Sequence, residues 1–531
     1  MTIDLISHIL AATPGWADQA EAAGLDQTSV SQILEETGRL AAARMAPLAA
    51  RADAEGCQQR EGRVQTPDGY AAMYRQLGED GWIAADLDPD LGGMGLPLAL
   101  HIAASLPMEG AALPFMMSLG ASRAAAHCLA ATDPELAKQW CPNLASGQWT
   151  ATICISEPDA GSDVGRIRTK ATETDQGWRI DGTKCWISFG DHDMAERIGH
   201  LCLARTGPAQ EGTRGLSLFL VPNLLDGGAP NGVTVERIEE KLGLHGSPTC
   251  VLRFEGAQAR MIGTPGRGLP QLFRMIELMR LQTGTQGAGI ALDCATLARD
   301  YAKDRRQGGR PDAPPVPLVT HPDVQRQLER LDARAVLLVG LVLQAAVTLD
   351  RARSGDPEAS ALAALLLPLA KTFGGELGQA SASDAIQLLG GAGYTREWRA
   401  ERHFRDARII TIYEGTTGMQ AQDFLLRRLL GCGDATLQAF LALGDQGPLT
   451  QRFVGLLERL RPAAPEVRLW AADAMLRAGW AVLSAGLCAR LHGIDADIDR
   501  GLQRYAAALP SRLIEAEAEV DLAFERAWQP D

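Results

Sequence analysis

The run Tyr413-Glu414-Gly415-Thr416-Thr417 is the most informative stretch of the chain. It places one carboxylate beside a glycine and two hydroxyls, and it follows a basic segment over 399–408 that has helical character. A glycine at such a point lets a ligand approach the backbone closely. An isolated glutamate in a turn is usually a surface residue, so the interpretation of Glu414 depends on motifs elsewhere in the chain.

Two other motifs carry polar groups on turns. Ser156-Glu157-Pro158-Asp159-Ala160-Gly161-Ser162-Asp163 combines proline and glycine in a turn that presents hydroxyls and backbone N–H groups, and Trp186-Ile187-Ser188 follows it. Such groups suit the polar edge of a flavin or a phosphate. Gln387-Leu388-Leu389-Gly390-Gly391-Ala392-Gly393 follows an apolar helical run instead of a strand, which is unlike a dinucleotide-binding loop.

Composition limits the class of protein. A chain of 531 residues is too long for one core and predicts several domains. Its 46% hydrophobic and 22% charged residues are ordinary for a soluble globular protein. The net charge of −14 and the pI of about 5.2 argue against a general affinity for nucleic acid.

The cysteines and the apolar runs suggest no metal site and no membrane span. None of the ten cysteines is spaced as Cys-x-x-Cys, so we expect no metal and reduced, mostly buried thiols. The N-terminus lacks the features of an export signal. The longest apolar run, 335–349, is shorter than the roughly 18–20 residues that span a bilayer. We expect a buried helix there and a cytoplasmic protein.

Hydrophobic periodicity divides the chain into four predicted domains. Residues 1–150 have helical spacing, with one interrupting loop at 88–97, and 151–262 form a β domain. Residues 263–430 form a helical bundle with a proline-rich loop at 308–317, and 431–531 form an additional helical tail.

The β domain is predicted to be antiparallel, because short strands follow one another without helices between them. One strand, 177–184, is expected to enter an Asp181-Gly182 turn. The predicted strands are 149–155, 177–184, 200–205, 215–222, 233–237 and 249–254.

These ordered motifs, spread over about residues 90–425, resemble the FAD-dependent acyl-CoA dehydrogenase family. The resemblance implies a mainly α fold with a middle β domain: an N-terminal helical domain, the β domain, a C-terminal four-helix bundle and, here, an extra C-terminal helical segment. It implies α,β-dehydrogenation of an acyl-CoA thioester to the 2-enoyl-CoA, with hydride passing to flavin N5.

The resemblance also assigns residues, with Glu414 as the catalytic base. Some relatives place the base just before the position of Arg280, but Met279 stands there and cannot act as one. The FAD contacts implied are Ser156, Ser162, Trp186, Ser188, Arg305, Gln387, Gly391 and Thr416. The substrate contacts implied are Ser162, Arg280 and Gly415.

A carboxylate base is weak in water, with an ordinary pKa of about 4.3. Burial beside a thioester and a flavin would raise the pKa of Glu414 toward the operating pH. By resemblance, the Glu414 backbone N–H and a flavin ribityl hydroxyl polarise the thioester carbonyl. Losing one such donor typically costs about 2.7–4 kcal/mol of transition-state stabilisation.

The run Glu240–Cys250 is similar to a pattern in a larger-subunit branch of the family, the branch of 3-methylmercaptopropionyl-CoA dehydrogenase, although His245 can equally be a loop histidine without a role. Membership implies an electron-transfer flavoprotein as partner, a role in fatty acid metabolism, and a homodimer or tetramer. Two alternatives stay open: an oxidase that uses oxygen, and a DNA-associated relative. The second needs a basic surface, whereas the arginines of 431–531 are mixed with many acids.

Overall fold

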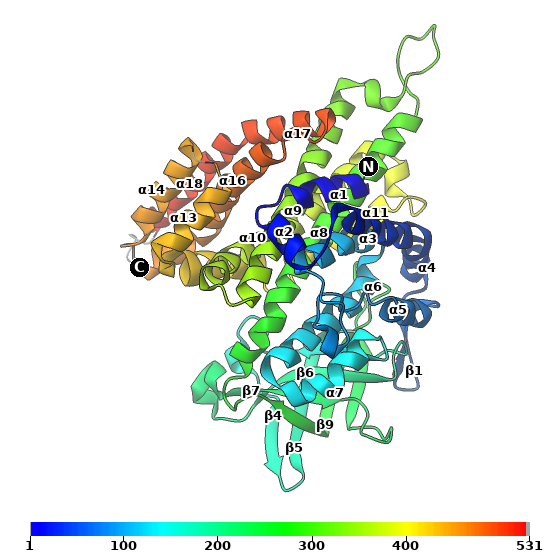
Figure 1. Ribbon diagram of the computed structural model, residues 1–531, viewed down its shortest axis with the longest axis vertical. Coiled ribbons are helices and arrows are strands. Elements are labelled where there is room, and N and C mark those ends of the chain that lie inside the picture. Colours follow the sequence, from blue (N-terminus) through cyan, green and yellow to red (C-terminus); the bar gives the residue numbers. More distant parts are fainter. Residues whose placement is uncertain (1, 446, 527–531) are drawn as a thin grey trace. The chain divides into compact units, whose positions relative to one another are not determined.

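The computed structural model describes residues 2–445 and 447–526 (Figure 1). Its backbone contacts group the chain into two compact units. We call Ala43–Leu96 with Ala112–Met279 the sheet unit, and Met1–Ala42 with Pro97–Ala111 and Arg280–Asp531 the helical unit. Two long helices, α6 (Leu98–Thr132) and α8 (Gly268–Asp304), contribute residues to both.

The sheet unit contains short helices and a small hairpin besides its main sheet. The helices are α4 (Ala46–Glu55), α5 (Tyr70–Glu79) and α7 (Pro134–Ala145). The hairpin of β1 (Gln58–Arg60) and β2 (Arg63–Gln65) was not among the predicted strands. Arg63 Nε lies 2.9 Å from Asp191 Oδ2, so an ion pair fixes this hairpin within its unit.

The main sheet has seven strands in the order β3-β6-β4-β5-β9-β7, with β8 paired to β9. Its strands are β3 (Trp149–Cys154), β4 (Lys170–Thr174), β5 (Gly177–Ser188), β6 (Arg197–Arg205), β7 (Leu216–Pro222), β8 (Val233–Ile238) and β9 (Thr249–Ile262). The antiparallel prediction is wrong in part, because β3 and β4 pair with β6 in parallel. The chain leaves β3 through a long loop that holds only the short 3₁₀ turn Val164–Arg166 before β4, and this loop allows a parallel pairing without an intervening α-helix.

The expected Asp181-Gly182 turn is also wrong, because β5 continues through it. Its register with β9 shifts between Ile180 and Gly182, and a Cβ on Gly182 would lie 2.5 Å from Thr169 Oγ1. The glycine therefore serves close packing at a bulge, a common use of glycine inside a strand. The core of the sheet is built from buried side chains such as Ile187, Phe219 and Phe254.

Long helices form the centre of the helical unit: α9 (Pro322–Arg353), α10 (Pro357–Leu389) and the part of α8 that begins at Arg280. Glycines allow α8 and α10 to approach closely, since a Cβ on Gly287 would lie 1.9 Å from Gly374 O. The other helices before the tail are α1 (Thr2–Ala11), α2 (Trp16–Ala22), α3 (Gln27–Leu40), α11 (Ala400–Ala407) and α12 (Thr417–Gln422).

Three helices of the described chain, α6, α9 and α10, are long and apolar enough to cross a membrane by length and composition. Of the residues in their most apolar windows, 89%, 94% and 78% are buried inside the fold. The run 335–349 lies in α9 and is buried along its length, which confirms the expected buried helix. The thiols are mostly buried as predicted, with only Cys57 and Cys432 partly exposed.

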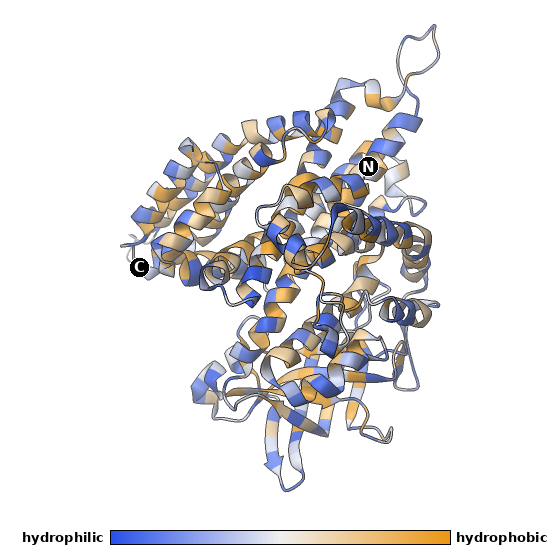
Figure 2. Cartoon of the chain, in the orientation of Figure 1, coloured by the Kyte–Doolittle hydropathy of each residue, from blue (hydrophilic) through white to orange (hydrophobic). Residues whose placement is uncertain are grey.

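The C-terminal tail is helical throughout its described residues. It comprises α13 (Asp434–Leu443), α14 (Pro448–Leu460), α15 (Pro465–Trp470), α16 (Ala472–Arg490), α17 (Ala496–Ala507) and α18 (Leu509–Arg526). Hydrophobic and hydrophilic residues alternate along these helices (Figure 2), as in amphipathic helices that bury one face. The tail joins α10 through stacked Phe373 and Trp480 rings, whose centroids lie 4.7 Å apart, and through Arg477 and Glu376.

Candidate active site

Glu414 lies on a strained turn between the 3₁₀ segment Arg408–Thr411 and α12. Its φ is +54° and that of Gly415 is +86°. A left-handed conformation is costly for a residue with a side chain and is commonly found at functional sites. The fully buried Gln420 holds the turn, because its Nε2 donates to Glu414 O at 2.9 Å.

The turn leaves a backbone donor available. Within the described chain, the N–H of Glu414 has no hydrogen-bond acceptor. A Cβ on Gly415 would lie 2.8 Å from Gln420 Nε2, and the φ of +86° also favours glycine at this position. The turn can therefore present an N–H and a carboxylate from the same residue.

Two cations act on the carboxylate of Glu414. Burial raises its pKa, whereas the positive charges of Arg280 and Lys371 oppose the rise. Lys371, on α10, is fully buried, and its Nζ has no hydrogen-bond partner among the described residues. Burial lowers the pKa of Lys371 to about 8, although Glu414 opposes that shift. Sequence reasoning missed Lys371, since nothing near it in the chain marks a site.

Arg280 is engaged with a buried carboxylate. Its Nη1 lies 2.6 Å from Asp423 Oδ2, and the Asp423 side chain is almost fully buried. Arg428 Nε approaches the same carboxylate at 3.3 Å. The proposed contact of Arg280 with substrate stays a prediction, but the residue does belong to the electrostatic surroundings of Glu414.

A second buried acid lies in the same unit. Glu109 is fully buried on α6, burial raises its pKa well above the usual range, and it accepts a hydrogen bond from Gln282. Tyr413 donates its hydroxyl to Gln286, and the charges of Glu109 and Glu414 both act on it. Glu109 was not predicted, because it sits in an apolar helix without a motif.

In the sheet unit, a buried ion pair fixes the loop that carries Ser156. Lys184 is fully buried, and its Nζ lies 2.9 Å from both Glu157 Oε1 and Ile155 O. Glu157 also accepts from the N–H groups of Arg168 and Thr169 at 2.7 and 3.0 Å. Burial raises the pKa of Glu157, but Lys184 and these donors lower it overall. Both neighbours of Ser156 are thereby held, and its own carbonyl accepts from Cys185 N–H at 3.0 Å.

Trp186 and Ser188 lie at the irregular end of β5. Trp186 has a φ of +62° and is 62% exposed, both unusual for a large aromatic residue in a strand. Among the described residues, the side-chain hydroxyls of Ser156, Ser162 and Ser188 make no hydrogen bond. Ser156 and Ser188 are half-buried and Ser162 is exposed. An exposed indole with unpaired hydroxyls fits a flat polar ring.

The cofactor residues assigned to the helical unit lie on its surface. Arg305 follows the end of α8 and is exposed, with no ion pair to another described residue. Gln387 is exposed in the last turn of α10, and Gly391 has open space where a Cβ would be. Thr416 caps α12 by accepting from Met419 N–H at 3.4 Å. A free guanidinium and open glycines fit a pyrophosphate, so the residues present are compatible with FAD.

The His245 segment has a structural contact in the sheet unit. His245 Nδ1 lies 3.1 Å from Asp53 Oδ1 on α4, and its Nε2 lies 3.1 Å from Lys241 O. The following Pro248 accepts from Phe189 N–H at 2.7 Å, just after Ser188. His245 therefore supports the loop that flanks the end of β5.

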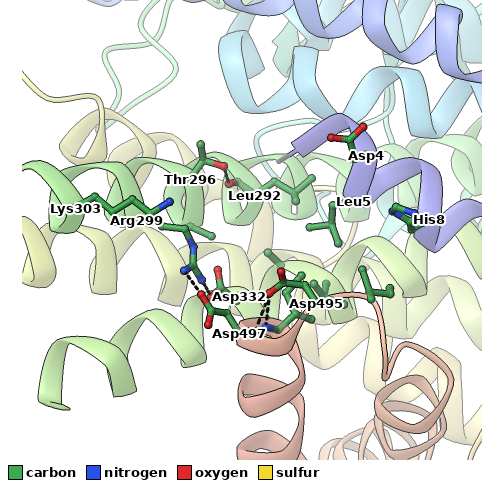
Figure 3. Close-up of a pocket in the computed structure, with 15 residues that line it drawn as sticks. Asp4, Leu5, His8, Leu292, Thr296, Arg299, Lys303, Asp332, Asp495 and Asp497 are labelled. Carbon is green, nitrogen blue, oxygen red and sulfur yellow. Dashed lines mark hydrogen bonds and ion pairs between the residues drawn. The ribbon is translucent and has the colours of Figure 1, made fainter. Parts of the chain in front are cut away.

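A cavity of about 290 Å³ lies away from Glu414, in the helical unit (Figure 3). Residues of α1, α8, α9 and the start of α17 line it. Arg299 pairs there with Asp332 and, at 2.9 Å, with Asp497. These pairs connect α17 to the centre of the unit, and the cavity contains none of the residues predicted for catalysis.

Comparison with known proteins identifies the domains in order. The chain matches family descriptions of the acyl-CoA dehydrogenase N-terminal domain over residues 28–148, the middle domain over 152–257 and the C-terminal domain over 266–430. It is 39% identical to 3-methylmercaptopropionyl-CoA dehydrogenase of Ruegeria pomeroyi over 456 residues, which are 81% of this chain and 77% of that protein.

Two further relatives extend the comparison. The broad-specificity linear acyl-CoA dehydrogenase FadE5 of Mycobacterium tuberculosis is 36% identical over 391 residues, 69% of this chain and 64% of that protein. The structure of Caenorhabditis elegans ACDH-11 in complex with C11-CoA superposes with a TM-score of 0.80 at 20% identity, covering 99% of this chain and 94% of the other. This likeness confirms the predicted fold class and includes the tail.

Proposed function

The chain belongs to the acyl-CoA dehydrogenase family, whose members depend on FAD, and from this premise we propose that it oxidises an acyl-CoA thioester to the 2-enoyl-CoA with Glu414 as base. The observation that carries the assignment of the base is the turn at Glu414. One residue there combines a carboxylate whose pKa is raised by burial with an unpaired backbone N–H.

Each residue has a defined task in the proposed reaction. Glu414 takes the proton from Cα of the thioester, and its backbone N–H donates a hydrogen bond to the thioester carbonyl oxygen. Bound FAD supplies the acceptor for the hydride that leaves Cβ. Ser156, Ser188 and Trp186 would hold the flavin ring system, and Arg305 would neutralise the pyrophosphate. These assignments follow the family pattern and are supported by the unpaired polar groups described above.

The raised pKa of Glu414 suits a base that works near neutral pH. Ordinary glutamate is too weakly basic to remove a Cα proton at a useful rate, and a pKa nearer the operating pH increases the driving force. The positive charges of Arg280 and Lys371 oppose this rise in the pKa of Glu414 and so favour its ionised form. Glu109 is a poorer candidate for the base, because it already accepts a hydrogen bond from Gln282 and no cation among the described residues opposes the rise that burial causes in its pKa.

The substrate is proposed as an acyl-CoA of the kinds that name the relatives, either 3-methylmercaptopropionyl-CoA or a linear acyl-CoA. We further propose an electron-transfer flavoprotein as acceptor, a cytoplasmic location, and a homodimer or tetramer in which Arg305 and Gln387 reach the FAD of a second subunit. An oxidase would instead release hydrogen peroxide during aerobic turnover.

The test is anaerobic mixing of the purified protein with a panel of acyl-CoA thioesters. We expect a yellow protein with about one non-covalent FAD per chain, whose oxidised-flavin absorbance disappears with at least one thioester. Peroxide formed in air at the rate of substrate oxidation would favour the oxidase. A colourless protein that rejects added FAD would contradict the proposal.

A further inference from the structure

We propose that Lys371 is a positioning residue for Glu414, whose ammonium group keeps the base ionised and directed into the site between turnovers. This inference rests on the proposed function of Glu414 as base. It concerns a residue on a different helix, outside every motif that the sequence presented.

The first observation is the burial of Lys371 without a partner. The side chain is fully buried, and its Nζ lacks a hydrogen-bond partner in the described parts of the chain. Burying a charged amine without a hydrogen bond is costly unless a charge nearby compensates.

The second observation is the segment against which the Lys371 face of α10 packs. Gly375 lies one helical turn further along α10 on the same face. A Cβ on Gly375 would lie 3.1 Å from Thr411 Cγ2 and 3.2 Å from Ile410 C. This face of α10 therefore packs against the segment that leads directly into Glu414. Lys371 shares this face of α10 and lies one turn nearer the helix N-terminus.

The third observation concerns the other charges. Three charged groups act on Lys371: Glu414, Arg280 and Glu376. Arg280 is held by Asp423 at 2.6 Å, and Glu376 is held by Arg477 of the tail at 3.0 Å. Glu414 makes no ion pair with the described residues. Lys371 and Glu414 are thus two opposite charges, each without a close partner, that act on one another through space.

A buried ammonium near Glu414 would keep the carboxylate ionised without occupying its oxygens. Removing water from a carboxylate favours its protonated form, which cannot accept the Cα proton. A close ion pair would keep the carboxylate charged but would also occupy its oxygens. A buried ammonium that acts at longer range opposes protonation and leaves the oxygens free for substrate. Lysine suits this role better than arginine, since a compact point charge has no planar fork of donors that must be satisfied.

The experiment uses Lys371→Met in the complete FAD-loaded protein, with Lys371→Arg as a charge-retaining variant and Lys138→Met as a matched control at an exposed site. The rate of anaerobic flavin reduction is measured against pH. The titration of the Glu414 carboxyl is followed separately by infrared difference spectroscopy without substrate, with Glu414→Gln identifying its band.

For Lys371→Met we expect an unchanged FAD content and an unchanged or higher melting temperature, because an unpaired buried charge has been removed. The acid limb of the rate and the Glu414 carboxyl titration should both move to higher pH by about one unit, the lower end of the effect of a nearby opposite charge. Lys371→Arg should restore part of the shift, and Lys138→Met should leave both values unchanged.

A clearly lower melting temperature of Lys371→Met would overturn the inference, since it would mark the lysine as a structural support. An unmoved carboxyl titration in the folded variant would overturn it as well. Glu414→Gln separates this failure from that of the proposed function. If Glu414→Gln reduces its flavin at the wild-type rate, the base itself is misassigned; if it is inactive while Lys371→Met titrates like wild type, only the role of Lys371 falls.

Discussion

Two lysines of this chain are completely buried, and they are treated in opposite ways. Lys184 in the sheet unit contacts Glu157 and Ile155 O, both at 2.9 Å. Lys371 in the helical unit has no hydrogen-bond partner among the described residues. The same buried ammonium group is therefore ion-paired and hydrogen-bonded in one place and without a hydrogen bond to a described residue in the other.

The difference separates stability from function. A buried ion pair with further hydrogen bonds holds the backbone around it in place. Lys184 does this on both sides of Ser156, through Ile155 O and Glu157. A buried cation without a hydrogen bond does not stabilise the fold by itself. For Lys371 we infer that its role is its electrostatic effect on Glu414. Removing Lys184 should thus cost folding free energy, whereas removing Lys371 should alter the chemistry of Glu414.

The largest expected effect is on the rate, when Glu414 itself is changed. Glu414→Gln should bind FAD and acyl-CoA but lose the base, which by itself lowers a rate by about 10²–10⁴. The measurement is the rate of anaerobic flavin reduction with the best thioester. Glu109→Gln is the matched comparison, because it makes the same change at a second buried acid of the helical unit whose pKa burial also raises. Equal losses in both variants would contradict the assignment of the base.

The second-largest effect is expected on stability, when the ion pair between Lys184 and Glu157 is broken. Lys184→Met should lower the free energy of unfolding by about 3–5 kcal/mol, because Glu157 stays buried without its counter-charge. The urea midpoint followed by circular dichroism measures this, and FAD affinity should fall with it because Ser156 loses its support. A loss below about 1 kcal/mol would show that the backbone N–H groups of Arg168 and Thr169 alone hold the loop.

A smaller effect is expected at an exposed cation. Arg305→Ala should weaken FAD binding by about 1.5–3 kcal/mol, the usual value of a hydrogen bond to a charged group. FAD affinity is measured by fluorescence, and oligomeric state by light scattering, since the assigned contact crosses to a second subunit. Arg306→Ala, also exposed, is the control. Unchanged flavin affinity in Arg305→Ala would remove Arg305 from the site.

The sequence predicted the fold class and the family, because motifs such as Ser156–Asp163 and Tyr413–Thr417 are local and ordered along the chain. It failed where the outcome depends on distant partners. The Asp181-Gly182 pair is typical of a turn, yet contact with Thr169 makes it a bulge. The parallel pairing of β3 with β6 likewise depends on the path of a long loop.

The candidate site shows the same limit. Glu414 could be singled out because its neighbours in sequence are unusual. Lys371 and Glu109 could not, since each lies in an apolar helix and acquires its meaning only from residues far away in the chain. Lys184 could be placed in a strand from the sequence. Its contacts with Ile155 O and Glu157 could not be predicted, because they depend on how the strands fold together.

The smallest expected effect completes the comparison with a third lysine. Lys138 on α7 pairs with Glu135 at 3.1 Å, and both side chains are largely exposed. An exposed pair at this helical spacing contributes about 0.2–0.5 kcal/mol to the free energy of unfolding, because water hydrates both charges and screens their attraction. Lys138→Met should therefore change the urea midpoint barely measurably. If Lys138→Met lowered the free energy of unfolding as much as Lys184→Met does, burial would not be the reason that the Lys184–Glu157 pair is strong. The contrast between the two buried lysines would then lose its physical basis.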